Sequence, residues 1–151
     1  MTQANQILKI ENLDTLVDLE ELYLAENKIE KIENLERLKK LRTLDLSFNY
    51  IQEVENLHEN ELLEELWLSH NKMADFKDFE KLKELKSLKT VYFELCPVAR
   101  NPGYRQQVMD LVPTIKQIDH FRRDFNIQFK GAGIRIAKKK EEQPIEHQKD
   151  Q

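Results

Sequence analysis

Apolar residues recur along this chain with a period of 22 residues, and in three units they include a fixed asparagine followed by two further apolar positions. The three best copies are Leu19-Leu22-Leu24-Asn27-Ile29-Ile32, Leu41-Leu44-Leu46-Asn49-Ile51-Val54 and Leu63-Leu66-Leu68-Asn71-Met73-Phe76. A fourth copy, Leu88-Val91-Phe93-Cys96-Val98, starts 25 residues after the third, and Ile7, Ile10, Leu13 and Leu16 match the back half of an earlier unit. Such regular spacing is not expected by chance and indicates a repeat protein.

The units follow the leucine-rich pattern L-x-x-L-x-L-x-x-[NC]-x-[LI], in which each fixed position has a structural role. Leu22 and Leu24 are separated by one residue, so both point into the core from a short strand. The side chain of Asn27 can satisfy backbone groups where the chain turns after this strand, and its counterparts in later units are expected to form a ladder. Cys96 takes this position in the last unit, which favours a structural role over a reactive thiol.

These units predict the α/β class and a leucine-rich-repeat right-handed solenoid, with a parallel concave sheet and 3₁₀ or helical turns on the convex side. Apolar residues at every third position between the strands, as from Ile32 to Leu41, suit such turns. No unit buries its leucines alone, so neighbouring units must stack. The last return is three residues longer, and its apolar residues from Phe79 to Leu88 have helical spacing, which predicts one extra turn of helix there.

A helical cap is predicted after the last unit, because the exposed end of a solenoid needs cover. Asn101 is the expected N-cap, Pro102 the first helical position and Pro113 the end of the helix. The apolar side chains expected to cover the last repeat are Tyr104, Val108, Leu111, Ile115, Ile118, Phe121 and Phe125. The first unit has no comparable cap, so either Met1 to Leu8 covers that edge or the chain is a shortened version of a longer array.

The predicted leucine-rich-repeat domain comprises residues 1–125, with a partial first repeat, repeats starting at residues 19, 41, 63 and 88, and a cap over about 97–125. Residues 126–151 form a tail that is first basic and then of mixed charge. Ile145 is its one apolar side chain after Ala137, so the end of the tail is expected to be disordered in the free protein. Lys130 to Gly133 is glycine-rich but lacks the strand and helix that flank a phosphate loop, which favours a turn or linker.

Alternation along the strands assigns a set of side chains to the concave face: Glu21, Tyr23, Ala25, Thr43, Asp45, Ser47, Glu65, Trp67, Ser69, Thr90, Tyr92 and Glu94. The only tryptophan of the chain, Trp67, is therefore expected to stand on the open sheet beside Glu65 and next to Tyr92. An exposed aromatic residue on a rigid strand is typical of an anchor for a protein partner. The alternative interpretation is that Trp67 and Tyr92 stack on each other and only cover the sheet.

Composition and charge narrow the class of protein. A chain of 151 residues with 40% hydrophobic and 34% charged side chains fits one soluble domain with a modest tail. No apolar run is long enough for a membrane helix, the start does not resemble a secretory signal, and no N-x-[ST] site occurs, so we expect the nucleus, the cytoplasm or both. Residues 1–120 carry 16 Lys and Arg against 23 Asp and Glu, which suits a basic protein partner better than a nucleic acid.

The sequence contains no pattern typical of an enzyme. His58, His70, His120 and His147 have no metal-ligand spacing, there is no G-x-S-x-G motif, and the single cysteine belongs to the ladder. Most carboxylates occupy solvent-facing positions, and no two are paired by the sequence for acid-base chemistry. We therefore expect no catalysis, no cofactor, no metal, no membrane contact and no small-molecule substrate. The basic run from Arg135 to Lys140 could bind an acidic partner or act in nuclear import.

The repeats resemble those of the leucine-rich-repeat regulatory subunit of protein phosphatase 1. The resemblance rests on the IEN-L ending of a repeat (residues 32–35), the run from LEELWLSHN to SLKTVYFE (residues 63–94), and the cap NPGYRQQVMDLVPTIKQID (residues 101–119). It covers roughly residues 7–125 and identifies a short or divergent member. Repeats and caps of this type also occur in the spliceosomal A-prime protein, in axonemal dynein light chains and in acidic nuclear phosphoproteins.

The resemblance implies a non-catalytic protein that docks on the catalytic subunit of protein phosphatase 1 through its concave face. It gives the binding role to Glu65 and Trp67 in E-x-W, to Tyr92 in T-V-Y, and to Asp45. Tyr23 and Glu21 occupy the corresponding positions of the first complete repeat and extend the predicted site. The alternative function is a leucine-rich-repeat scaffold in another intracellular complex, spliceosomal or axonemal.

Overall fold

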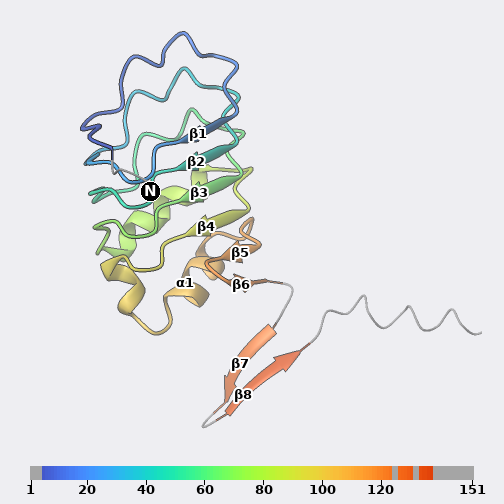
Figure 1. Ribbon diagram of the computed structural model, residues 1–151. Helices are drawn as coiled ribbons and strands as arrows, with labels where there is room; N and C mark the ends of the chain where they lie inside the picture. Colours follow the sequence, from blue (N-terminus) through green and yellow to red (C-terminus); the bar gives the residue numbers. More distant parts are fainter. Residues whose placement is uncertain (1–4, 124–125, 131–132, 138–151) are drawn as a thin grey trace, which may run out of the picture.

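The computed structural model describes residues 5–123 together with the backbone of residues 126–130 and 133–137. A six-stranded sheet runs along one side of the molecule, and strands that follow one another in sequence are neighbours in space (Figure 1). The strands are β1 (Glu21–Tyr23), β2 (Thr43–Asp45), β3 (Glu65–Trp67), β4 (Thr90–Tyr92), β5 (Gln117–Ile118) and β6 (Phe121–Arg122). The first five are parallel, and β6 is antiparallel to β5.

The register of the sheet places equivalent positions of the repeats side by side. Leu44 lies opposite both Leu22 and Leu66, and Leu66 lies opposite Val91. Leu44, Leu66 and Val91 are completely buried, whereas Leu22 in the edge strand is half-buried. Burying a side chain of this size contributes roughly 1.5 to 3 kcal/mol. The predicted alternation of core and surface positions is therefore confirmed, and with it the leucine-rich-repeat solenoid.

The asparagine ladder has the predicted role at the turn after each strand. The amide of Asn49 donates to the carbonyl of Leu24 at 3.0 Å in the preceding repeat, and its Oδ1 accepts from the backbone N–H of Ile29 at 2.9 Å. The Sγ of Cys96 donates to the carbonyl of Leu68 at 3.1 Å in the same way. Because buried backbone groups need partners, these side chains fix one repeat to the next.

The returns are less helical than the sequence suggests. Between β1 and β3 they consist of hydrogen-bonded turns, such as the one in which the N–H of Leu38 donates to the carbonyl of Leu35 at 3.0 Å. The longer last return forms the 3₁₀ helix η1 (Phe76–Glu84), whose N-cap Asp75 accepts from the N–H of Lys77. The extra helix is thus confirmed, but the shorter returns have only enough residues for single turns.

The cap begins at Pro97 as predicted, but its α-helix begins later than predicted. A 3₁₀ helix, η2 (Pro97–Arg100), comes first, and Asn101 ends it in an extended conformation. The α-helix α1 (Tyr104–Leu111) follows, with Gly103 at its N-cap, so the assignment of Asn101 as N-cap and of Pro102 as first helical residue is wrong. The cause is Pro97, which starts a tight turn that occupies the chain as far as Asn101. The helix ends just before Pro113, as predicted.

Most of the predicted covering residues of the cap pack against the last repeat. Those that are buried are Tyr104, Val108, Ile115 and Ile118, and Leu111 is half-buried. The prediction that Phe121 covers the last repeat is wrong, because its side chain is 39% exposed. The centroid of its ring lies 4.6 Å from the guanidinium carbon of Arg105. Phe125 lies outside the described residues.

At the opposite end, residues 5–7 pair with the first complete repeat. The N–H of Ile7 donates to Oδ1 of Asn27 at 3.0 Å, and the N–H of Lys28 donates to the carbonyl of Ile7 at 2.9 Å. The initial segment therefore supplies part of the cover for this edge, although Leu8 is 69% exposed.

Beyond the cap, β7 (Asn126–Lys130) and β8 (Gly133–Ala137) form an antiparallel pair with Lys130 opposite Gly133. Neither strand was predicted from the sequence. Disorder was predicted for the end of the tail. Residues 138–151 lie outside the described part of the chain.

Candidate protein-binding surface

The outward side chains of β1 to β4 form two columns that cross the sheet in register. The first column consists of Tyr23, Asp45, Trp67 and Tyr92. The second consists of Glu21, Thr43, Glu65 and Thr90. Neighbouring strands are about 4.8 Å apart, so each column spans roughly 15 Å. All six residues proposed from the sequence thus lie on one face, which we call the concave face.

Trp67 and Tyr92 form the centre of this face. Their rings meet edge to face, with centroids 5.3 Å apart and an interplanar angle of 65°. The Nε1–H of Trp67 donates to Oε1 of Glu65 at 3.2 Å, and both rings are half-buried. The two rings are therefore in contact, as in the alternative interpretation, but edge to face and not stacked. The contact also fixes the indole in one orientation, which lowers the entropy that a partner must remove on binding.

Carboxylates surround the exposed aromatic side chain at the first strand. Tyr23 is 56% exposed, and its hydroxyl donates to Oε1 of Glu21 at 3.0 Å. That hydrogen bond, then desolvation, and then the negative charges of Glu21, Glu65 and Asp45 raise the pKa of Tyr23 above its ordinary value. The concave face is therefore acidic around its aromatic residues, which complements a partner with basic side chains around an apolar group.

Two further residues at the cap end of this face, Gln117 and Glu94, were not among the six predicted site residues. Gln117 in β5 donates from Nε2 to the hydroxyl of Tyr92 at 3.0 Å and holds that ring from the side of the cap. Glu94, which follows β4, pairs through Oε2 with Nε2 of His120 at 3.4 Å. Glu94 was assigned to the concave face by alternation, but Gln117 had no periodic signal because β5 has only two residues.

Asp119 positions the cap end of this surface. It is completely buried, and its Oδ1 accepts from the N–H groups of Phe93 and Glu94 at 2.8 and 3.1 Å. Its Oδ2 accepts from the Nε–H of Arg105 at 2.8 Å and from the hydroxyl of Tyr104. Burial and the hydrogen bond to this carboxylate raise the pKa of Tyr104 far above its ordinary value. One carboxylate therefore ties β4 to α1.

The thiol of Cys96, the one cysteine of the chain, is buried. Burial raises the pKa of the Cys96 thiol to about 11, so it is not a thiolate near neutral pH. Within residues 5–123 and the two later strands, no three His, Cys, Asp or Glu side chains gather in a way that could hold a metal ion. In the same part of the chain, no helix is both long and apolar enough to cross a membrane.

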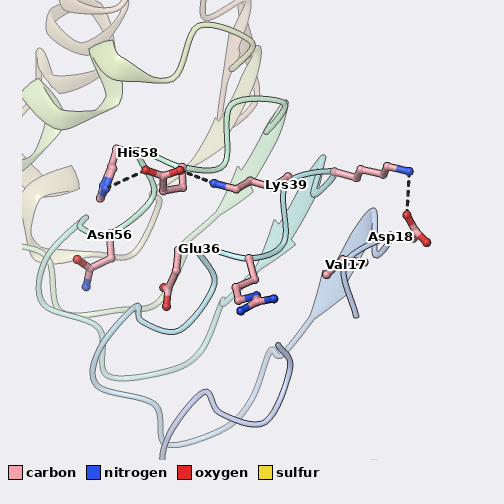
Figure 2. A pocket seen from close by; sticks show the side chains of 9 residues that line it. Val17, Asp18, Glu36, Lys39, Asn56 and His58 are labelled. Atoms are coloured by element: carbon pink, nitrogen blue, oxygen red, sulfur yellow. Dashed lines mark hydrogen bonds and ion pairs between the residues drawn. The ribbon is translucent and has the colours of Figure 1, made fainter. Parts of the chain in front are cut away.

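An open hollow of about 780 Å³ lies between the returns on the convex side (Figure 2). Ion pairs between repeats line it. The Nζ of Lys40 lies 2.8 Å from Oδ1 of Asp18, and Lys39 pairs with Glu59, which also lies 3.7 Å from Nε2 of His58. The pairing with Lys40 lowers the pKa of Asp18. These ion pairs connect neighbouring repeats. Because their side chains are exposed, they add little stability.

Comparison with known proteins identifies the family. A family model described as leucine-rich repeat matches residues 2–143, so the chain belongs to the leucine-rich-repeat family. A chain in the crystal structure of the Drosophila melanogaster SNF/U2A′ complex is 31% identical, with a TM-score of 0.72 over 78% of this chain and 69% of that chain.

Two bacterial structures share the fold. A leucine-rich-repeat protein of Leptospira interrogans, LIC12759, is 25% identical, with a TM-score of 0.63 over 75% of this chain and 29% of that chain. Internalin C2 of Listeria monocytogenes is 22% identical, with a TM-score of 0.62 over 77% and 48% of the two chains. A search of curated proteins gives no match. This chain is a leucine-rich-repeat scaffold of the kind that binds proteins, in a family that is not typically catalytic.

Proposed function

We propose that this chain is a non-catalytic subunit that binds one protein partner through the concave face, with Trp67 and Tyr92 as the central anchor. The observation that carries the proposal is the ring pair itself, held by Glu65 on one side and Gln117 on the other. Fixed aromatic residues at the centre of a surface contribute most to protein binding, and the surrounding carboxylates select a basic partner.

Two partners are candidates. Similarity to a chain of the SNF/U2A′ complex favours an SNF-type protein and a nuclear, spliceosomal scaffold. The E-x-W and T-V-Y motifs around Trp67 and Tyr92 favour the catalytic subunit of protein phosphatase 1, in the nucleus or the cytoplasm. The 31% sequence identity with a chain of the SNF/U2A′ complex extends over 78% of this chain. It makes an SNF-type protein the first candidate, and the phosphatase is the second.

Replacing Trp67 by alanine should weaken binding to the true partner by at least about thirtyfold, equivalent to about 2 kcal/mol, as expected for a central aromatic anchor. The measurement is isothermal titration of the purified chain with SNF and, in parallel, with the phosphatase catalytic subunit. A partner that binds the folded variant as tightly as the unchanged protein does not use this face. Failure of both proteins to bind the unchanged chain at micromolar concentration would remove both candidates.

Replacing Glu65 by alanine should weaken the same interaction less, and the loss should shrink as salt is added, because Glu65 meets a partner cation at the edge of the anchor. Glu36→Ala is the matched control, since Glu36 is exposed on the convex side. Titrations at two salt concentrations distinguish the variants. Equal losses for Glu65→Ala and Glu36→Ala would show only a general effect of charge.

A further inference from the structure

A second exposed apolar surface lies where the chain turns over the asparagine ladder, and we call it the ladder edge. It consists of Phe48, Tyr50, His70, Lys72, Leu95 and Arg100. Phe48, Tyr50 and Leu95 are 48%, 43% and 65% exposed. The ring of Phe48 stacks on that of His70 with centroids 4.1 Å apart and an interplanar angle of 15°. Exposed side chains of this size that gather in one place indicate a binding surface.

The residue before each ladder position has a left-handed backbone, namely Glu26, Phe48, His70 and Leu95. Phe48 and Leu95 have φ values of 59° and 66°, in the left-handed region. Bulky residues are uncommon in that region, which asparagine and glycine occupy at lower cost. Because this conformation recurs in each repeat, the turn accounts for the backbone but not for the choice of Phe48 and Leu95, whose large side chains are exposed.

The ladder edge is also hollow and basic. A groove of about 410 Å³ passes along it, which is within the size range of ligand clefts. Its charged lining residues, Lys72 and Arg100, are both basic, although residues 1–120 are acidic as a whole. Within residues 5–123, neither has a carboxylate at ion-pairing distance, and the Nζ of Lys72 lies 5.4 Å from the ring centroid of Tyr50.

We propose that the ladder edge binds a short acidic peptide segment that carries an aromatic or large aliphatic side chain. The carboxylates of the peptide pair with Lys72 and Arg100, and Arg100 offers a guanidinium that can hold a carboxylate through two hydrogen bonds. The apolar side chain of the peptide packs on Phe48, Tyr50 and Leu95. This site lies apart from the concave face, so it does not depend on the function proposed for Trp67.

An acidic peptide fits better than a nucleic acid. Stacked rings with nearby cations also occur in proteins that bind single strands, but those proteins use a positive groove that follows many phosphates. Here two cations stand on an acidic body, which would repel a long polyanion. A short peptide has few carboxylates, and all of them can lie in the groove near Lys72 and Arg100.

The probe is the fluorescein-labelled peptide Glu-Asp-Leu-Phe-Glu-Asp, and the readout is fluorescence anisotropy with the full chain. A dissociation constant below about 1 mM at low salt is expected. The double variant Lys72→Glu with Arg100→Glu should bind at least about tenfold more weakly. Phe48→Asn should bind about fivefold more weakly while remaining folded, because asparagine tolerates the left-handed conformation.

The matched control is Arg37→Glu with Lys86→Glu, which makes the same change in net charge on the convex side and should leave binding within about twofold. Trp67→Ala should also retain the peptide, which separates this site from the concave face. The proposal is overturned if the peptide does not bind, if the control reduces binding as much as the double variant, or if Lys-Lys-Leu-Phe-Lys-Lys binds equally. Tighter binding of an oligouridine than of the acidic peptide would overturn it in favour of a nucleic-acid site.

Discussion

Replacing Asp119 by alanine should lower the free energy of unfolding by about 3 to 5 kcal/mol, as expected when several buried hydrogen-bond donors lose their acceptor. The carboxylate is completely buried and accepts hydrogen bonds from Phe93, Glu94, Tyr104 and Arg105. Without it, two backbone N–H groups and a guanidinium would lose their partner inside the cap. The left-handed φ of 55° at this position adds to the cost for alanine. Urea unfolding followed by circular dichroism measures the change.

Two further variants test the cause of this loss. Asp119→Asn keeps the shape and tolerates the left-handed backbone, but its amide cannot replace a carboxylate oxygen that accepts from Arg105, so an intermediate loss is expected. Asp110→Ala removes an exposed carboxylate of α1 that accepts from Gln106 at 2.9 Å, and should change stability by less than about 0.5 kcal/mol. If Asp119→Ala were as mild as Asp110→Ala, the cap would not depend on the buried carboxylate.

Asp119 also shows what the sequence could not predict. Its partners Tyr104 and Arg105 lie 15 and 14 residues earlier, and no period connects them. Gln117 was missed for the same reason, since a two-residue strand leaves no alternation to read. The start of α1 was misplaced because Asn101 and Pro102 have the local pattern of a helix start, while the preceding 3₁₀ turn from Pro97 decides the geometry.

The repeats were predictable because each unit carries its own signal and neighbouring units repeat it. Leu44 and Leu66 could be assigned to the core from period-two alternation, and the ladder from the fixed position of Asn49. The same alternation occurs in β7 and β8, where Ile127, Phe129 and Ile134 alternate with polar residues. This alternation is typical of strands, but each strand of the pair is only five residues long and stands outside the repeat.

The candidate site was only partly accessible to the same reasoning. Alternation alone puts Trp67 and Tyr92 on one face, because both lie between core positions of adjacent strands. It does not give the edge-to-face contact or the hydrogen bond from Gln117, which depend on side-chain orientation and on the fold of the cap. The ladder edge has no period-two signal at all, since Phe48 and Leu95 lie in turns.

The second large effect concerns the core position beside the anchor. Leu66→Ala should lower the free energy of unfolding by about 2 to 5 kcal/mol, because Leu66 is completely buried between Leu44 and Val91 and its loss leaves a cavity. Trp67→Ala, one residue later, should cost only about 0.5 to 1.5 kcal/mol, the contribution of an aromatic pair with Tyr92. Thermal and urea unfolding of both variants measure the difference.

The contrast between these neighbours matters for function as well as for stability. Side chains in a strand alternate between its two faces, so a shift of one residue would exchange the roles of Leu66 and Trp67. A smaller loss for Leu66→Ala than for Trp67→Ala would place the indole in the core and remove it from the binding surface. The expected order instead leaves Trp67→Ala folded, so that its loss of partner binding can be attributed to the concave face itself.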